Sequence, residues 1–216
     1  MKNLLSILVT SVAYLFSAIW SSAQQVITFD DLSPQEVYAG PIPNGYAGFE
    51  WHSFGVMDPE LFPGDPVGNL NGMVSPRHVA FPAYVGSLDG PQTGGFHLPG
   101  HVFDLNSAYL TSAWNDGLQV EVLGFLRGEL IYRSTYMLDT AAPTWVNFNY
   151  LGIDEVKFSS YGGIPHGNLG GGGYGMVVDN LIVTIPEPSA ISLFLFCMGV
   201  LGYRVAKRGW RHKELS

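Results

Sequence analysis

The sequence predicts an all-β body, folded as an antiparallel two-sheet sandwich of the jelly-roll type, between two apolar ends. The body is rich in aromatic and β-branched residues, and no apolar stripe of helical period runs through it. Apolar and polar residues alternate instead: Val146, Phe148 and Tyr150 are interleaved with Asn147 and Asn149. This period of two is typical of strands with one buried and one wet face. Because glycines and prolines separate many short runs, a sandwich is expected, with an open barrel as the alternative.

Ten segments have the composition or alternation of strands. They are 26–29, 48–57, 78–83, 101–104, 108–114, 118–125, 129–138, 145–150, 155–160 and 176–185. Residues 126–129, Leu-Arg-Gly-Glu, predict a hairpin turn, since Gly128 can adopt a positive φ.

Composition restricts what the body can be. Residues 24–188 have the usual length of one domain. The single cysteine, Cys197, lies in the apolar C-terminal run, so the body contains no disulfide. Only four cations lie in the body, whereas all but one of the 18 carboxylates of the chain do. Such an acidic body cannot neutralise phosphates, which argues against nucleic-acid binding.

The N-terminal 23 residues have the features of a secretory signal peptide. Lys2 provides the positive charge, residues 4–20 form the apolar helix, and Ser21-Ser22-Ala23 places small residues at the cleavage site. Signal peptidase is therefore expected to cut after Ala23. A retained N-terminal anchor is the alternative.

The C-terminus predicts a single membrane helix followed by a cytoplasmic tail. Residues 189–203 carry no charge, and the apolar surface continues to Ala206. A helix over 189–206 would span roughly 27 Å, which suits a thin bilayer. The basic tail, residues 204–213, contains Arg204, Lys207, Arg208, Arg211 and Lys213. It should remain cytoplasmic and leave the body outside.

Pro186-Glu187-Pro188 directly precedes the predicted membrane helix. This order of Pro-Glu-Pro, apolar helix and basic cluster, over residues 185–213, resembles the PEP-CTERM sorting signal of Gram-negative bacteria. The resemblance implies recognition and cleavage near residues 186–188 by an exosortase, a membrane-embedded enzyme similar to cysteine transpeptidases. It also implies a place at the cell surface or in an exopolysaccharide matrix. The two prolines keep the segment extended and open to a protease.

The body, residues 24–184, is similar to those of PEP-CTERM proteins of unassigned function. The similarity lies in residues 27–32, 46–51, 113–132 and 178–181. In outline the body also resembles lectin-like and carbohydrate-binding jelly rolls. The resemblance favours the fold and leaves the activity open.

Acidic side chains at the first and last strands suggest a structural calcium site. Asp30 and Asp31 end the first strand, and Asp179 and Asn180 lie within the last. If these strands are neighbours, their oxygens could meet, and Ca²⁺ prefers oxygen ligands. The alternative is that these side chains cap turns through hydrogen bonds to the backbone.

Two tryptophans are candidates for stacking on a sugar. Trp145 is out of phase with Val146, Phe148 and Tyr150, so it should point away from the core. Trp51 is a weaker candidate. For both residues, packing within the protein is the alternative.

No catalytic or transition-metal motif is present in the sequence. His97 and His101 are separated by Pro99-Gly100, which excludes a shared helix, and His52, His78 and His166 stand alone in the sequence. The sequence therefore favours a non-enzymatic surface or matrix protein that binds polysaccharide. Two alternatives remain: an enzyme acting on exopolysaccharide, with Asp104, Asp116 or Glu121 as candidate acids, and a purely structural adhesive domain.

Overall fold

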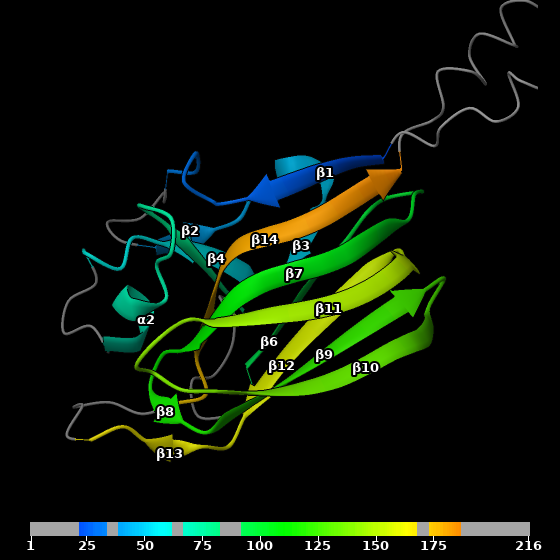
Figure 1. Ribbon diagram of the computed structural model, residues 1–216. Helices are drawn as coiled ribbons and strands as arrows, with labels where there is room; N and C mark the ends of the chain where they lie inside the picture. Colours follow the sequence, from blue (N-terminus) through cyan, green and yellow to red (C-terminus); the bar gives the residue numbers. More distant parts are fainter. Residues whose placement is uncertain (1–21, 34–38, 62–66, 83–91, 168–172, 187–216) are drawn as a thin grey trace, which may run out of the picture. The chain divides into compact units, whose positions relative to one another are not determined.

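The computed structural model describes residues 22–33, 39–61, 67–82, 92–167 and 173–186 (Figure 1). Residues 24–185 form one compact unit. The predicted signal helix and membrane helix fall outside the described residues. Within the described part of the chain, no helix is long and apolar enough to cross a membrane.

The prediction of an antiparallel two-sheet sandwich is confirmed. The larger sheet has seven strands in the order β11-β7-β14-β5-β4-β2, with β1 paired to β14. Its strands are β1 (Ser22–Ile27), β2 (Ala39–Pro41), β4 (Phe54–Met57), β5 (Val79–Pro82), β7 (Phe103–Ser112), β11 (Thr144–Ile153) and β14 (Met176–Pro186).

The smaller main sheet has five strands in the order β10-β9-β12-β6-β3. They are β3 (Glu50–His52), β6 (Gln92–His97), β9 (Leu118–Leu126), β10 (Glu129–Leu138) and β12 (Glu155–Tyr161). A third, two-stranded sheet pairs β8 (Asn115–Asp116) with β13 (Ile164–Pro165). From β6 to β14 the chain crosses repeatedly between the two main sheets, as a jelly roll requires. With seven strands, the larger sheet exceeds the four of a simple jelly-roll sheet.

The main core lies between the two sheets. Alternation decides which side chains enter it: Val120 and Val122 of β9 are fully buried, whereas Gln119 and Glu121 are partly exposed. Ring contacts connect both sheets through the core, with Phe49 5.1 Å from Phe96 and 5.0 Å from Phe103 between ring centroids. Because the body has no disulfide, burial of these apolar side chains must supply its stability.

A second apolar cluster lies on the opposite face of the seven-stranded sheet. Val56 and Ala80 belong to the main core, whereas Met57 and Val79, one residue along, pack with Val177 in the second cluster. The short helix α2 (Val67–Asn71) leads into the segment that covers this face. A Cβ atom on Gly72, just after the helix, would lie 2.3 Å from the Val177 side chain. Part of the outer face is thereby closed to solvent.

Several predicted strands have different limits in the structure. The expected strand 48–57 is divided at Ser53, whose φ of 51° marks the point where the chain passes from β3 in one sheet to β4 in the other. The segments 101–104 and 108–114 are largely one strand, β7. The expected turn at 126–129 is confirmed: Arg127 and Gly128 both have positive φ, and Leu126 pairs with Glu129.

Candidate functional site

Trp145 lies on the outer face of β11, as its position out of phase predicts. Its side chain is 43% exposed, and its ring centroid lies 4.7 Å from that of Tyr109 on the neighbouring strand β7. The indole N–H donates a hydrogen bond of 3.2 Å to Oδ1 of Asn147, two residues along the same face. The two rings and the amide form an exposed surface, which we call the Trp145 surface.

Trp51 is part of the core, which makes the prediction of a ligand-binding role for it wrong. It is 5% exposed, and its ring contacts Phe29, Phe54 and Phe96 at centroid distances of 5.9, 5.5 and 4.6 Å. Its indole N–H donates to the carbonyl of Tyr46. No face of the ring is free for a sugar.

The outer face of the five-stranded sheet carries two adjoining hollows. The larger, of about 740 Å³, is lined by His52, His97, His101, the turn at Arg127 and Glu155, among others. The smaller, of about 420 Å³, lies beside β6 and shares His52 and Glu155 with the larger. Gly95 has no side chain to fill the space between His52 and Lys157, its partners on the two adjacent strands. The lack of a side chain at Gly95 therefore helps to open the two hollows, which together we call the groove.

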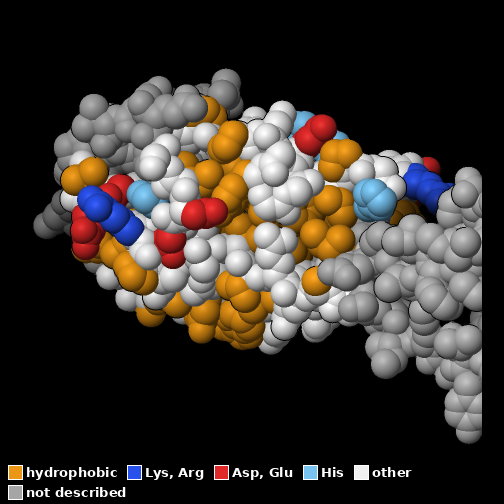
Figure 2. Space-filling view, turned by 90° about the horizontal axis from the view of Figure 1, so that it is seen from above, with side chains coloured by type: hydrophobic (Ala, Val, Ile, Leu, Met, Phe, Trp, Pro, Cys, Tyr) orange, Lys and Arg blue, Asp and Glu red, His pale blue; other side chains and the backbone are white. Residues whose placement is uncertain are grey.

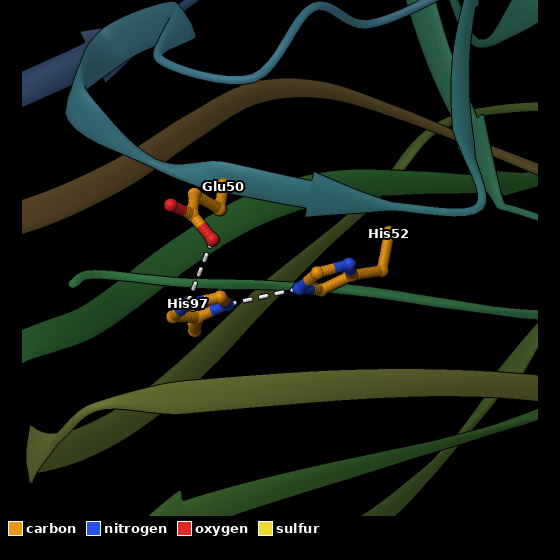
Figure 3. A group of neighbouring side chains, drawn as sticks. All are labelled: Glu50, His52 and His97. Atoms are coloured by element: carbon orange, nitrogen blue, oxygen red, sulfur yellow. Dashed lines mark hydrogen bonds and ion pairs between the residues drawn. The ribbon is translucent and has the colours of Figure 1, made fainter.

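Glu50, His52 and His97 lie together at the edge of this groove (Figure 3). His97 lies between the other two: its Nε2 is 3.2 Å from Oε2 of Glu50, and its Nδ1 is 2.9 Å from Nε2 of His52. The two imidazole planes differ by only 6° with centroids 5.0 Å apart. At these distances the rings meet edge to edge through their nitrogens rather than face to face.

This cluster was not predicted from the sequence. His52 stands alone along the chain, but antiparallel pairing places β3 beside β6, with Glu50 opposite His97 and His52 opposite Gly95. The strand that carries His97 was not predicted, because Gly94 and Gly95 weaken its strand signal. The alternation Glu50-Trp51-His52, with Trp51 buried, was the available signal that both polar side chains share the outer face.

The predicted calcium site is not formed. β1 and β14 are neighbours, as expected. The carboxylates of Asp30 and Asp179, however, accept hydrogen bonds from backbone N–H groups of the segment before β5. Oδ1 of Asp30 accepts hydrogen bonds from the N–H groups of Arg77 and His78. Oδ2 of Asp179 accepts from the N–H groups of Val74 and Ser75. Capping of a turn, the alternative interpretation, is what these two residues do.

Of the other two predicted calcium ligands, Asp31 is engaged through its side chain and Asn180 through its backbone N–H. Asp31 accepts a 2.6 Å hydrogen bond from the Tyr46 hydroxyl. Burial, followed by this hydrogen bond to a carboxylate, raises the pKa of Tyr46. Asn180 has a φ of 48°, and its N–H donates to Oδ1 of Asp179. Burial raises the pKa of Asp179, and its hydrogen bonds to Ser75, Val74 and Asn180 offset part of that rise.

The candidate catalytic carboxylates are separate from one another and have structural partners. Asp104 accepts from the N–H of Gly152, and Glu121 lies 3.5 Å from Arg133. Asp116 accepts from the N–H and hydroxyl of Thr140 and lies 2.5 Å from Nδ1 of His166. The His166 contact and the Thr140 backbone bond lower the pKa of Asp116 to about 2.

Pro186 is the last residue of β14, whereas the remaining predicted sorting residues lie outside the described part of the chain. These are Glu187, Pro188, Arg204, Lys207, Arg208 and Arg211.

Comparisons with known proteins found no matching family profile and no matching curated relative. Solved structures with a similar arrangement were found. A DUF4465 family protein from Bacteroides caccae has a TM-score of 0.47 and 12% identity, over 79% of this chain and 95% of that one. The module TmCBM61, in complex with β-1,4-galactotriose, has a TM-score of 0.33 and 11% identity, over 67% of this chain and 95% of that one. The module CBM51 of Clostridium perfringens, in complex with methyl-galactose, has a TM-score of 0.36 and 10% identity, over 74% and 99%.

Proposed function

We propose that this chain is an exported, non-enzymatic protein of the cell surface or extracellular matrix that binds polysaccharide. In this proposal an exosortase sorts it, and the Trp145 surface contacts the sugar. The observation that carries the binding role is the exposed indole of Trp145, held against Tyr109 on the outer face of the seven-stranded sheet.

The chemistry of the Trp145 surface suits a neutral glycan. The C–H face of a pyranose packs well on a flat aromatic ring, and an adjacent amide can exchange hydrogen bonds with hydroxyl groups. Asn147 supplies that amide. Because both strands belong to one paired sheet, little conformational freedom is lost when a ligand binds.

The export and sorting roles are supported by the two ends of the sequence and by where the last strand ends. The residues before the Pro-Glu-Pro motif belong to β14, and that strand ends at Pro186. Cleavage at residues 186–188 would therefore leave the sheet whole. The absence of cysteines from residues 24–188 also removes any dependence of the body on disulfide formation outside the cell.

Binding is tested by presenting the full-length protein, purified in mild detergent, to a glycan array and to the exopolysaccharide of the producing cells. We expect Trp145→Ala to weaken binding about tenfold, whereas Trp145→Phe keeps a ring and loses less. Met137→Ala, which truncates another exposed apolar side chain, is the matched control and should bind normally. Equal binding by Trp145→Ala and the original protein would refute the assignment of this surface.

Sorting is tested separately by fractionating cells with and without the exosortase gene. We expect the trimmed body outside the cell when the enzyme is present and the untrimmed chain in the membrane fraction when it is absent. Replacing Glu187 and both flanking prolines by alanine should have the same effect as loss of the enzyme. Untrimmed protein in the cytosol of normal cells would refute the sorting proposal.

A further inference from the structure

We propose that Glu50, His52 and His97 form a binding site for a divalent transition-metal ion on the outer face of the five-stranded sheet. Among the residues that the structure describes, this is the group in which three potential metal-binding side chains bring their ligand atoms within 4.8 Å of one another. The site does not depend on the polysaccharide proposal, because the Trp145 surface lies on the other sheet.

The ligand types select the class of metal. Imidazole nitrogens suit Zn²⁺, Cu²⁺ and Ni²⁺, whereas Ca²⁺ takes six to eight oxygen ligands. Two histidines with one carboxylate is a ligand set that leaves coordination positions open for water or an oxygen ligand. The groove beside the cluster gives those positions access to solvent.

The spacing of the two histidine nitrogens matches that of two ligands on one ion. At a metal–nitrogen distance of about 2.0–2.1 Å, nitrogens at right angles lie about 2.9 Å apart, and nitrogens at a tetrahedral angle about 3.3 Å. Nε2 of His52 and Nδ1 of His97 are 2.9 Å apart. In the structure one of these nitrogens donates a hydrogen bond to the other. Metal binding therefore requires His52 to carry its proton on Nδ1 instead of Nε2, and both rings to turn so that the two lone pairs point at a common ion. His52 is exposed and His97 is only partly buried, which permits this movement.

Glu50 can hold His97 in the orientation that binding requires. Oε2 of Glu50 is 3.2 Å from Nε2 of His97 and can accept its proton, which leaves Nδ1 as the metal ligand. A histidine that binds a metal through one nitrogen commonly donates its other N–H to a carboxylate. Glu50 therefore acts as an orienting residue or, after a change of rotamer, as a third ligand.

The surroundings favour a cation. Glu155 lies directly opposite His97 on β12, and Lys157, which lines the adjoining hollow, is 3.0 Å from the Glu155 carboxylate. The Lys157 ammonium also lies over the Phe125 ring, at 4.7 Å from its centroid. Its charge is thus balanced by Glu155, and the carboxylate of Glu50 remains available to the metal.

The test is calorimetric titration of the full-length, untagged protein in detergent with Zn²⁺, with Cu²⁺ and with Ca²⁺. We expect one Zn²⁺ or Cu²⁺ per chain, with Cu²⁺ the tighter, and no heat from Ca²⁺ at this site. His52→Ala and His97→Ala should each weaken binding at least tenfold, and Glu50→Gln about 10- to 100-fold. His101→Ala is the matched control, since His101 lines the same groove outside the cluster and should bind normally.

A second measurement identifies the ligands directly. The electron paramagnetic resonance spectrum of the Cu²⁺ form should show coupling to two imidazole nitrogens, and His52→Ala should reduce this to one. Circular dichroism of each variant will establish that it is folded. Absence of Zn²⁺ and Cu²⁺ binding, or binding that is unchanged in folded His52→Ala, would overturn the proposal.

Discussion

The carboxylate of Asp179 holds Ser75 by two hydrogen bonds, one from its backbone N–H at 2.8 Å and one from its hydroxyl at 3.1 Å. Asp179 lies in the last strand and is fully buried, and it also accepts from the N–H of Val74. One side chain thus fixes a segment more than one hundred residues earlier in the sequence against the seven-stranded sheet.

We therefore expect Asp179→Ala to be strongly destabilising. The substitution removes the acceptor of three backbone N–H groups, those of Val74, Ser75 and Asn180, which should lower the free energy of unfolding by about 2–4 kcal/mol. Urea unfolding followed by tryptophan fluorescence measures the change. Asp31→Ala, which removes the acceptor of a single hydrogen bond, should cost no more than about 1 kcal/mol. Equal losses in the two variants would contradict this role of Asp179.

Calcium should not stabilise the body. The carboxylates of Asp30 and Asp179 are already used by backbone N–H groups, so binding an ion would require breaking those bonds. A ligand that binds only the folded state raises the melting temperature, by an amount that grows with the logarithm of the ligand concentration divided by its Kd. We expect the melting temperature in millimolar Ca²⁺ to equal that in a chelator. A rise that disappears in Asp30→Asn would revive the calcium site.

The Asp116–His166 contact predicts a dependence of stability on acid pH. The pKa of Asp116 is lowered to about 2, from 3.8, chiefly by the hydrogen bond with His166. A lowered carboxyl pKa stabilises the folded state above the unfolded pKa, and that stabilisation is lost as pH falls from about 4 towards 2. Because the carboxylate is well exposed, solvent screening keeps the effect small.

The free energy of unfolding should therefore fall less steeply between pH 4 and 2 in Asp116→Asn than in the original protein. Chemical unfolding at several pH values within this range is the measurement. His166→Ala, which removes the principal cause of the shift, should also flatten the dependence. If the free energy of unfolding falls equally between pH 4 and 2 in all three proteins, the Asp116–His166 contact contributes nothing to stability.

Gly95→Ala should damage both the sheet and the groove. A Cβ atom at this position would lie 2.4 Å from the carbonyl oxygen of Val156, so the paired strands β6 and β12 would have to separate. We expect a loss of about 1–3 kcal/mol in the free energy of unfolding. Gly175→Ala, where the nearest atom is a side-chain carbon at 3.3 Å, should cost less. A Gly95→Ala variant as stable as the original would mean that the strands adjust freely.

The two candidate tryptophans, one on the surface and one in the core, differ in whether the sequence predicted their positions. Figure 2 shows a face on which apolar groups lie among scattered charged ones, with no extended block of either charge. The position of Trp145 outside the core followed from alternation within a single strand. The burial of Trp51 was not predicted, because its strand is only three residues long, too short for the polar residues on either side to establish an alternation.

Local patterns in the sequence were enough to predict the β class, the hairpin at Arg127-Gly128 and the outward direction of Trp145. Composition alone separates the acidic body from the basic C-terminal segment of the sequence. These features depend on alternation, turn chemistry and composition, which act over a few residues. The meeting of Glu50, His52 and His97, and the capping of residues 74–78 by Asp30 and Asp179, were decided only by the tertiary structure. They depend on which strands pair and in which register. Contacts between residues 45 or 104 positions apart are set by burial of the whole core rather than by any local signal.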